Sequence, residues 1–149
     1  MSDVSDVLNG LIETAKDGEQ GFKTAAEKAK ESSLKSLFSK YASQRASYVQ
    51  ELQTAVSGLG EKPTESGHAA AGLHRGWINL KQALSKNEDK AIIDEAESGE
   101  DAAKKAYSEA LQKTLPTDIK ALVQKQYNGV LEAHGVVRDL KHGRQAAGA

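Results

Sequence analysis

An internal repeat constrains this chain more than any other feature. Residues 11–29 reappear at 92–110 as a second segment with the same spacing of apolar, small and charged side chains. The matched residues are Leu11, Ile12, Ala15, Gly18, Glu19, Lys23, Ala25 and Ala29 in the first segment, and Ile92, Ile93, Ala96, Gly99, Glu100, Lys104, Ala106 and Ala110 in the second. Apolar side chains at alternating spacings of three and four residues indicate an amphipathic helix. A repeated helix with a Gly-Glu step in its apolar stripe predicts a bundle built from two related halves.

Periodicity and the positions of glycine and proline predict one all-α domain over residues 1–142. The predicted helices cover 2–30, 33–59, 68–85, 87–113 and 118–142, with a linker at 60–67 and a flexible C-terminal tail at 143–149. We expect Gly60 to end the second helix, because glycine readily adopts the left-handed backbone that often follows a helix. Two antiparallel helix pairs joined by a long connection form a ferritin-like up-down four-helix bundle, here with an additional short helix in the crossover connection.

Composition argues against several classes of function. The net charge is −1 and acidic and basic residues are interspersed, so there is no broad field for nucleic acid or an anionic membrane. Because the chain has no cysteine, disulfides, thiolate metal sites and thiol catalysis are excluded. The first residues lack the apolar run of a secretory signal, and no stretch is apolar enough to span a bilayer. We therefore expect a cytoplasmic protein that binds neither nucleic acid nor membrane and that can form a homo-oligomer.

Each of the four long predicted helices carries a polar residue near the middle of its apolar stripe. These residues are Glu19, Arg45, Glu100 and His134, and Tyr48 follows Arg45 by three residues. In di-iron and di-manganese bundles, two single glutamates and two Glu-x-x-His pairs meet at mid-bundle. Glu19 and Glu100 match the single glutamates. The other two helices depart from the pattern, because Leu131 stands three residues before His134 and the second helix offers Arg45-Ala46-Ser47-Tyr48.

The residues allow three interpretations of this polar cluster. In the first, all of its members form a buried network of ion pairs and hydrogen bonds that fixes the helix register. In the second, each glutamate lies on the shoulder of its stripe and pairs with Lys23 or Lys104, four residues later. In the third, Glu19, Glu100 and His134 are the ligands of an iron or manganese ion.

The predicted crossover helix contains Trp77, the only tryptophan of the chain. We interpret it as a core anchor between this helix and the bundle, because a large aromatic ring stabilises most when it is buried. Gly72 and Gly76 precede it in a small-residue pattern that indicates close helix contact. If that side of the helix is exposed, Gly72, Gly76 and Trp77 would instead form an interaction surface.

Four segments of the chain resemble one known family. They are Leu8–Thr14, Asp17–Phe22, Leu73–Lys81 and Glu97–Asp101. These segments are similar to the four-helix-bundle proteins of the DUF2383 group, also called the PA2169-like family, and the likeness covers nearly the whole chain. The resemblance implies a ferritin-like fold and a bacterial source, and it carries over no catalytic residue.

The sequence supports function hypotheses from different classes. The principal one is a non-catalytic, stress-associated bundle that needs no cofactor and acts by binding or self-assembly. A nucleophile elbow, a P-loop and a dinucleotide fingerprint are all missing from the sequence, and the cationic Arg45 opposes a metal cluster. The alternative is a degenerate metal-binding oxidoreductase or peroxide-handling protein that uses iron or manganese. A third hypothesis is an interaction module that uses the segment from Gly72 to Trp77 to bind a protein partner or a second copy.

Overall fold

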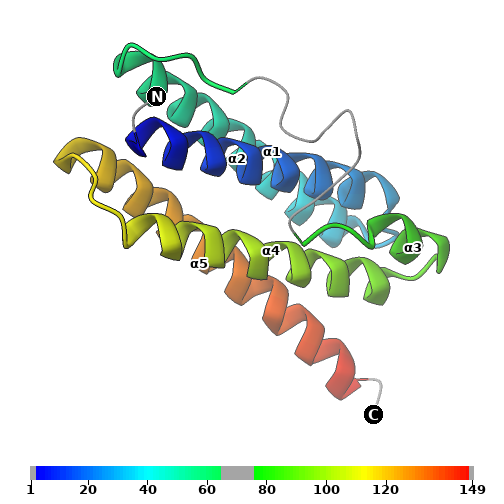
Figure 1. The fold of residues 1–149 in the computed structure, drawn as a ribbon. Coiled ribbons are helices and arrows are strands. Elements are labelled where there is room, and N and C mark those ends of the chain that lie inside the picture. Colours follow the sequence, from blue (N-terminus) through cyan, green and yellow to red (C-terminus); the bar gives the residue numbers. More distant parts are fainter. Residues whose placement is uncertain (1–2, 65–75, 148–149) are drawn as a thin grey trace.

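The chain folds as a helical bundle. The computed structural model describes residues 3–64 and 76–147. These residues form α1 (Asp3–Lys28), α2 (Ser32–Gly58), the short α3 (Leu80–Ser85), α4 (Asp89–Leu111) and α5 (Thr117–Ala147), as Figure 1 shows. No strand occurs in the described part of the chain, so the predicted all-α class is confirmed. Nor does any helix in this part have the length and apolar character needed to cross a membrane.

The long helices form two antiparallel pairs, α1 with α2 and α4 with α5 (Figure 1). The pairs are joined mainly by α1 packing on α4, whereas α2 and α5 make only a small contact. Because α2 and α4 run in the same direction, α2 ends and α4 begins at opposite ends of the bundle. At the start of the connection between them, the backbone N–H of Thr64 donates to Asn9 Oδ1 of α1 at 2.9 Å.

The repeat continues from α1 and α4 into α2 and α5. Buried residues at equivalent positions are Phe38, Arg45, Val49 and Val56 in α2, and Ile119, Gln126, Val130 and Val137 in α5. The two antiparallel pairs are therefore related halves of one bundle. In this relation Gln126 is the counterpart of Arg45, and Glu100 is the counterpart of Glu19.

Glycine ends α2 as predicted. Gly60 has a φ of 78°, and its backbone N–H donates to Ser57 O at 2.9 Å. The N–H of Glu61 donates to Val56 O at 3.3 Å. These two bonds satisfy carbonyls in the last turn of the helix and form a Schellman motif.

Two segments differ from the predictions. Residues 68–75 of the predicted crossover helix lie outside the described residues. Residues 76–79 are not helical, and α3 begins at Leu80. Gly76 has a φ of 95°, in the left-handed region that side-chain-bearing residues rarely adopt. At the other end, α5 continues to Ala147, although a tail was predicted from Gly143. A single glycine costs a helix only about 1 kcal/mol and does not end it.

The core consists of two hydrophobic clusters at different levels of the bundle. The first contains Leu8, Leu11, Ile12, Ala15, Val49, Leu52, Val56, Ala103, Tyr107, Ala110, Ile119, Val123 and Val130. The second contains Phe22, Ala25, Ala29, Leu34, Phe38, Tyr41, Trp77, Leu80, Ile92, Ile93, Ala96, Ala133 and Val137. Both clusters draw residues from both helix pairs. Along α2 and α4, Arg45 and Glu100 stand between the residues of one cluster and those of the other.

A carboxylate ties the two pairs together at one end of the bundle. Asp89, the first residue of α4, accepts hydrogen bonds from the backbone N–H groups of Lys30 and Glu31 at 2.7 and 3.0 Å. Lys30 and Glu31 lie in the turn between α1 and α2. The start of the second half therefore caps a turn of the first half, which fixes the relative position of the two pairs.

Candidate functional site: a polar centre in the bundle

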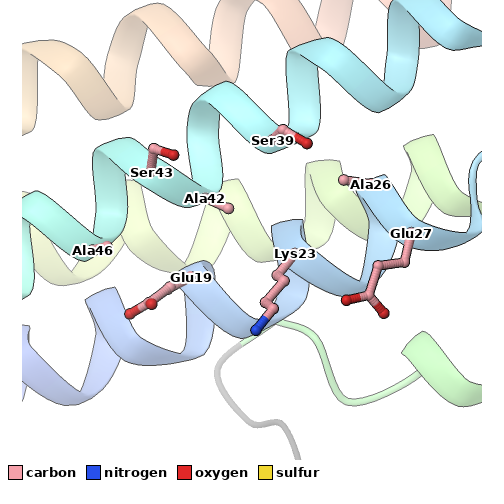
Figure 2. Close-up of a pocket in the computed structure, with 8 residues that line it drawn as sticks. All are labelled: Glu19, Lys23, Ala26, Glu27, Ser39, Ala42, Ser43 and Ala46. Carbon is pink, nitrogen blue, oxygen red and sulfur yellow. The ribbon is translucent and has the colours of Figure 1, made fainter.

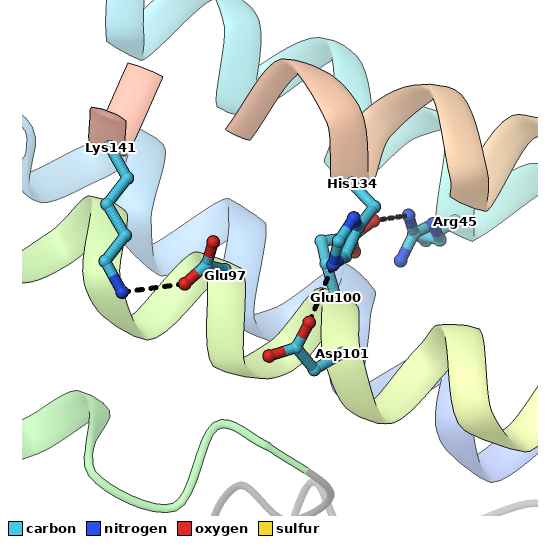
Figure 3. Close-up of polar contacts among 6 residues, drawn as sticks. All are labelled: Arg45, Glu97, Glu100, Asp101, His134 and Lys141. Atoms are coloured by element: carbon cyan, nitrogen blue, oxygen red, sulfur yellow. Dashed lines mark hydrogen bonds and ion pairs between the residues drawn. The ribbon is translucent and has the colours of Figure 1, made fainter. Parts of the chain in front are cut away.

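A buried ion pair lies at the middle of the bundle. Arg45 of α2 donates from Nη2 to Glu100 Oε2 of α4 at 2.7 Å, and the two side chains are 1% and 0% exposed (Figure 3). Both residues occupy core-facing positions of their helices, where their neighbours are apolar. The pair links the first half of the chain to the second, since each helix pair contributes one partner.

The surroundings of Arg45 explain why a guanidinium fits in this core. A Cβ atom on Gly18 would lie 3.1 Å from Arg45 Nη1, so the glycine of the first Gly-Glu step makes room for the side chain. The Phe22 ring packs under the guanidinium at 5.3 Å, close enough for a cation–π interaction. Arg45 Nε also donates to Gln44 Oε1 at 3.1 Å.

Arg45 keeps its positive charge, although it is buried. Burial lowers the pKa of Arg45, but the Glu100 carboxylate more than offsets this effect and leaves that pKa raised above its usual value. Glu100 uses only one of its two oxygens in the bond to Arg45. Its Oε1 is buried and has no hydrogen-bond partner in the described part of the chain. Removing one partner of the pair would therefore leave the other buried without a compensating charge.

A second polar network adjoins the pair. Tyr107 donates from its hydroxyl to Gln126 Oε1 at 2.6 Å, and Gln126 Nε2 donates to Glu51 Oε1 at 3.0 Å and to Tyr48 O at 3.3 Å. The Tyr48 hydroxyl lies against Gly129 of α5. Burial raises the pKa of the Tyr107 hydroxyl well above its ordinary value, so this group is a hydrogen-bond donor at neutral pH. The sequence interpretation did not single out Tyr107 and Gln126, although a glutamine in an apolar stripe was the available signal.

His134 lies at the rim of the bundle, between α4 and α5. Its Nε2 is 2.6 Å from Asp101 Oδ1, and the two side chains are 13% and 63% exposed (Figure 3). The fully buried residue of this turn is Ala133. Lys141 lies further along the same rim, where it donates to Glu97 Oε1 at 2.7 Å. The structure therefore places His134 in a row of polar contacts along the rim, beside the ion pair but not within it.

Glu19 lies on the outside of the α1/α2 pair. It is half-buried and lines a groove of about 470 Å³ together with Lys23, Ala26, Glu27, Ser39, Ala42, Ser43 and Ala46 (Figure 2). The three alanines lie between the helices, and the charged residues follow the α1 edge. Glu19 and Glu100 are equivalent in the sequence repeat, yet Glu19 faces a groove and Glu100 is fully buried.

The structure does not bring together the three residues of the metal-ligand interpretation. Glu100 is paired with Arg45, His134 with Asp101, and Glu19 faces the groove. Within 3–64 and 76–147, no three His, Cys, Asp or Glu residues are grouped so that they could hold a metal ion. The guanidinium of Arg45 also places a positive charge beside the one fully buried carboxylate of the proposed set.

Trp77 is buried between the two halves. Its indole ring lies against Gly21 of α1 and Gly99 of α4, and its side chain is 2% exposed. The ring also packs edge-on against Phe22, with 5.0 Å between ring centroids. This placement agrees with the core-anchor interpretation. It opposes the interaction-surface interpretation, since a buried ring offers nothing to a partner. Gly72, the other end of that surface, lies outside the described residues.

The protein is an all-α bundle of two related halves. A buried ion pair and a buried tryptophan lie between these halves. The chain belongs to the family described as Domain of unknown function (DUF2383), whose model matches residues 3–113. The match covers α1, α2, α3 and α4. No curated protein matches the chain.

Proposed function

We propose that this protein is a non-catalytic, ferritin-like bundle that acts by binding or by self-assembly. The observation that carries the proposal is the Arg45–Glu100 ion pair, which occupies the mid-bundle position with less than 2% exposure of either side chain. A pair closed from solvent can neither contact a substrate nor exchange ligands. Its role in this proposal is to fix how the four long helices are aligned.

The ferritin-like part of the proposal rests on topology. Two antiparallel pairs with α2 and α4 parallel require a connection that returns along the bundle, which is the arrangement of ferritin-like folds. The proposal departs from the metal-binding members of such folds, because an arginine stands where they hold ligands. A role under stress belongs to the same hypothesis, and the cellular amount of the protein before and after stress would test it.

Elemental analysis is the direct test against the metal-dependent alternative. Tag-free protein from cells supplied with iron and manganese would be compared with Glu19→Ala and His134→Ala, two variants outside the buried core. We expect far less than one metal ion per chain and no difference between the three proteins. Near-stoichiometric metal that is lost in both variants would overturn the proposal and establish the oxidoreductase alternative.

Sedimentation analysis tests the assembly part of the proposal. We expect the average mass to rise with protein concentration, because an assembling module follows mass action. Mass that stays monomeric at every concentration would restrict the proposal to binding of a different partner.

A further inference from the structure

The groove between α1 and α2 exists because its walls carry small residues where the other half carries large ones. Its alanines are Ala26, Ala42 and Ala46, and the repeat matches them to Tyr107, Val123 and Tyr127. In the second half, Tyr107 and Val123 are fully buried and Tyr127 is half-buried between α4 and α5. The first half therefore has an unfilled apolar space where its counterpart has side chains of its own.

Among the described residues, one apolar side chain is strongly exposed and could fill such a space. Ile78 is 73% exposed, in the turn just before α3, whereas Leu59 and Leu131, the other exposed large apolar residues in the described part of the chain, are each 37% exposed. Its neighbour Trp77 is held in the core, so the position of Ile78 is fixed by a buried anchor. A backbone position that is already held in place loses little conformational entropy on binding.

Charge favours contact between these two surfaces. The α1 edge of the groove carries the carboxylates of Glu19 and Glu27, with Lys23 between them (Figure 2). Lys81 and Lys86, which follow Ile78 in the sequence, both have exposed basic side chains. Opposite charges at the rim steer two surfaces together and select their orientation, while the apolar contact supplies the affinity.

We infer that the α1/α2 groove is a self-association site that receives Ile78 of a second copy of this chain. The alanine floor takes the isoleucine side chain, and Lys81 of the incoming copy lies near Glu19 and Glu27 at the rim. This inference rests on the assembly part of the proposed function and specifies its contact. A knob and a groove on different parts of one molecule form a closed dimer when both copies exchange Ile78.

Single cysteines provide a direct test, because the chain has none of its own. Ile78→Cys protein would be mixed with Ala42→Cys protein under mild oxidation, and disulfide-linked heterodimer would be followed on non-reducing gels. The matched control is Leu59→Cys mixed with Ala42→Cys. We expect the first mixture to crosslink several-fold faster than the control. Equal rates would overturn the inference.

A groove-filling variant gives a second readout that needs no oxidation. Ala46→Tyr introduces at this position the residue found at its counterpart, Tyr127, and Ser47→Tyr places the same side chain on the exposed α2 surface next to the groove. We expect Ala46→Tyr to shift the sedimentation mass toward monomer at unchanged helical content, and Ser47→Tyr to leave it unchanged. Oligomers that persist in Ala46→Tyr and do not crosslink through Ile78 would overturn this contact while leaving self-assembly in place.

Discussion

At the scale of single residues, the ion pair makes the centre of the bundle unusually sensitive to substitution. Removing one partner of a buried pair leaves the other charge without compensation, whereas replacing both with apolar groups removes the desolvation penalty as well. Arg45 and Glu100 meet the conditions for this behaviour, since both are almost completely buried and Glu100 Oε1 already has no partner in the described residues. Single and double replacements should therefore differ in a way that an exposed pair would not show.

We expect Arg45→Met to lower the free energy of unfolding by about 3–5 kcal/mol, because Glu100 is left buried without its partner. The double variant Arg45→Met with Glu100→Leu should recover most of this loss. Urea unfolding followed by circular dichroism measures both. Lys141→Met, which breaks the partly exposed pair with Glu97, is the control and should change stability by no more than about 0.5 kcal/mol. A double variant no more stable than Arg45→Met would contradict this account of the pair.

Tyr107 should make stability depend on pH in the alkaline range. Burial raises the pKa of its hydroxyl above the ordinary value of 10.0, so the folded state keeps a proton that the unfolded chain loses. The stability that depends on the protonated Tyr107 hydroxyl is therefore fully present below about pH 10 and is lost as the pH rises further. Urea unfolding between pH 8 and 11 should show a steeper loss of stability for the unmodified protein than for Tyr107→Phe.

The same variant should be less stable at neutral pH by about 0.5–1.5 kcal/mol, because Gln126 Oε1 loses its donor. The two stability curves should therefore converge above pH 10. Curves that stay parallel over the whole range would show that Tyr107 does not resist ionisation.

At the scale of elements, a tryptophan held between two glycines joins α1 to α4. Gly21 and Gly99 leave the space that the Trp77 ring occupies, and Gly76 adopts a left-handed backbone beside Ser98 and Gly99. The glycine of the second Gly-Glu step thus has a packing role. Its counterpart Gly18 lies against the Arg45 side chain. The same repeat position therefore makes room for an indole ring in one half and for a guanidinium in the other.

Two glycine-to-alanine substitutions should have opposite effects. In Gly99→Ala the added methyl group would overlap the Trp77 ring. We therefore expect the free energy of unfolding to fall by about 1–3 kcal/mol, as for overpacked cores. Gly10 is also within a helix, and an added Cβ atom there would have nothing within 4 Å. We expect Gly10→Ala to raise the free energy of unfolding by about 0.5–1 kcal/mol. Thermal unfolding measures both changes. Because Trp77 is the only tryptophan, its fluorescence should shift to the red in Gly99→Ala alone.

The starts of the long helices could be predicted closely from the sequence because start signals are local. The predicted starts of the four long helices lie within two residues of Asp3, Ser32, Asp89 and Thr117. The segment before α3 could not be predicted in the same way. The backbone of Gly76 depends on contact with Ser98 and Gly99, which are distant in sequence, and helical propensity carries no information about that contact.

The candidate site could be predicted only in part, for a related reason. Periodicity locates a polar residue on the apolar stripe but does not resolve neighbouring positions on a helix. His134 lies one residue from the buried Ala133 and therefore faces the rim. Glu19 and Glu100 occupy equivalent positions in the repeat, and the structural difference between them is that Arg45 reaches Glu100 across the bundle. Such a pairing depends on how the two halves pack together, and the local sequence pattern does not show this.

At the scale of the whole molecule, neither half closes a core of its own. The first cluster places Leu8 and Leu52 against Tyr107 and Val123, and the second cluster likewise draws on both pairs. The Arg45–Glu100 ion pair and the hydrogen bond from Lys30 to Asp89 also join the two halves. A helix pair alone would expose the apolar faces that these contacts cover, and most of the stability of helices in proteins comes from the packing of such faces.

We therefore expect the fragments 1–64 and 76–149 to be weakly helical alone and to regain the bundle when mixed. Circular dichroism should show more helix in the mixture than in the sum of the fragments, and Trp77 fluorescence should shift to the blue as the ring enters its site between Gly21 and Gly99. Arg45→Met in the first fragment should weaken this association by the energy that it costs the intact chain, whereas Lys23→Met on the outer groove should not. A second fragment that is fully helical and buries Trp77 without the first would contradict the interdependence of the two halves.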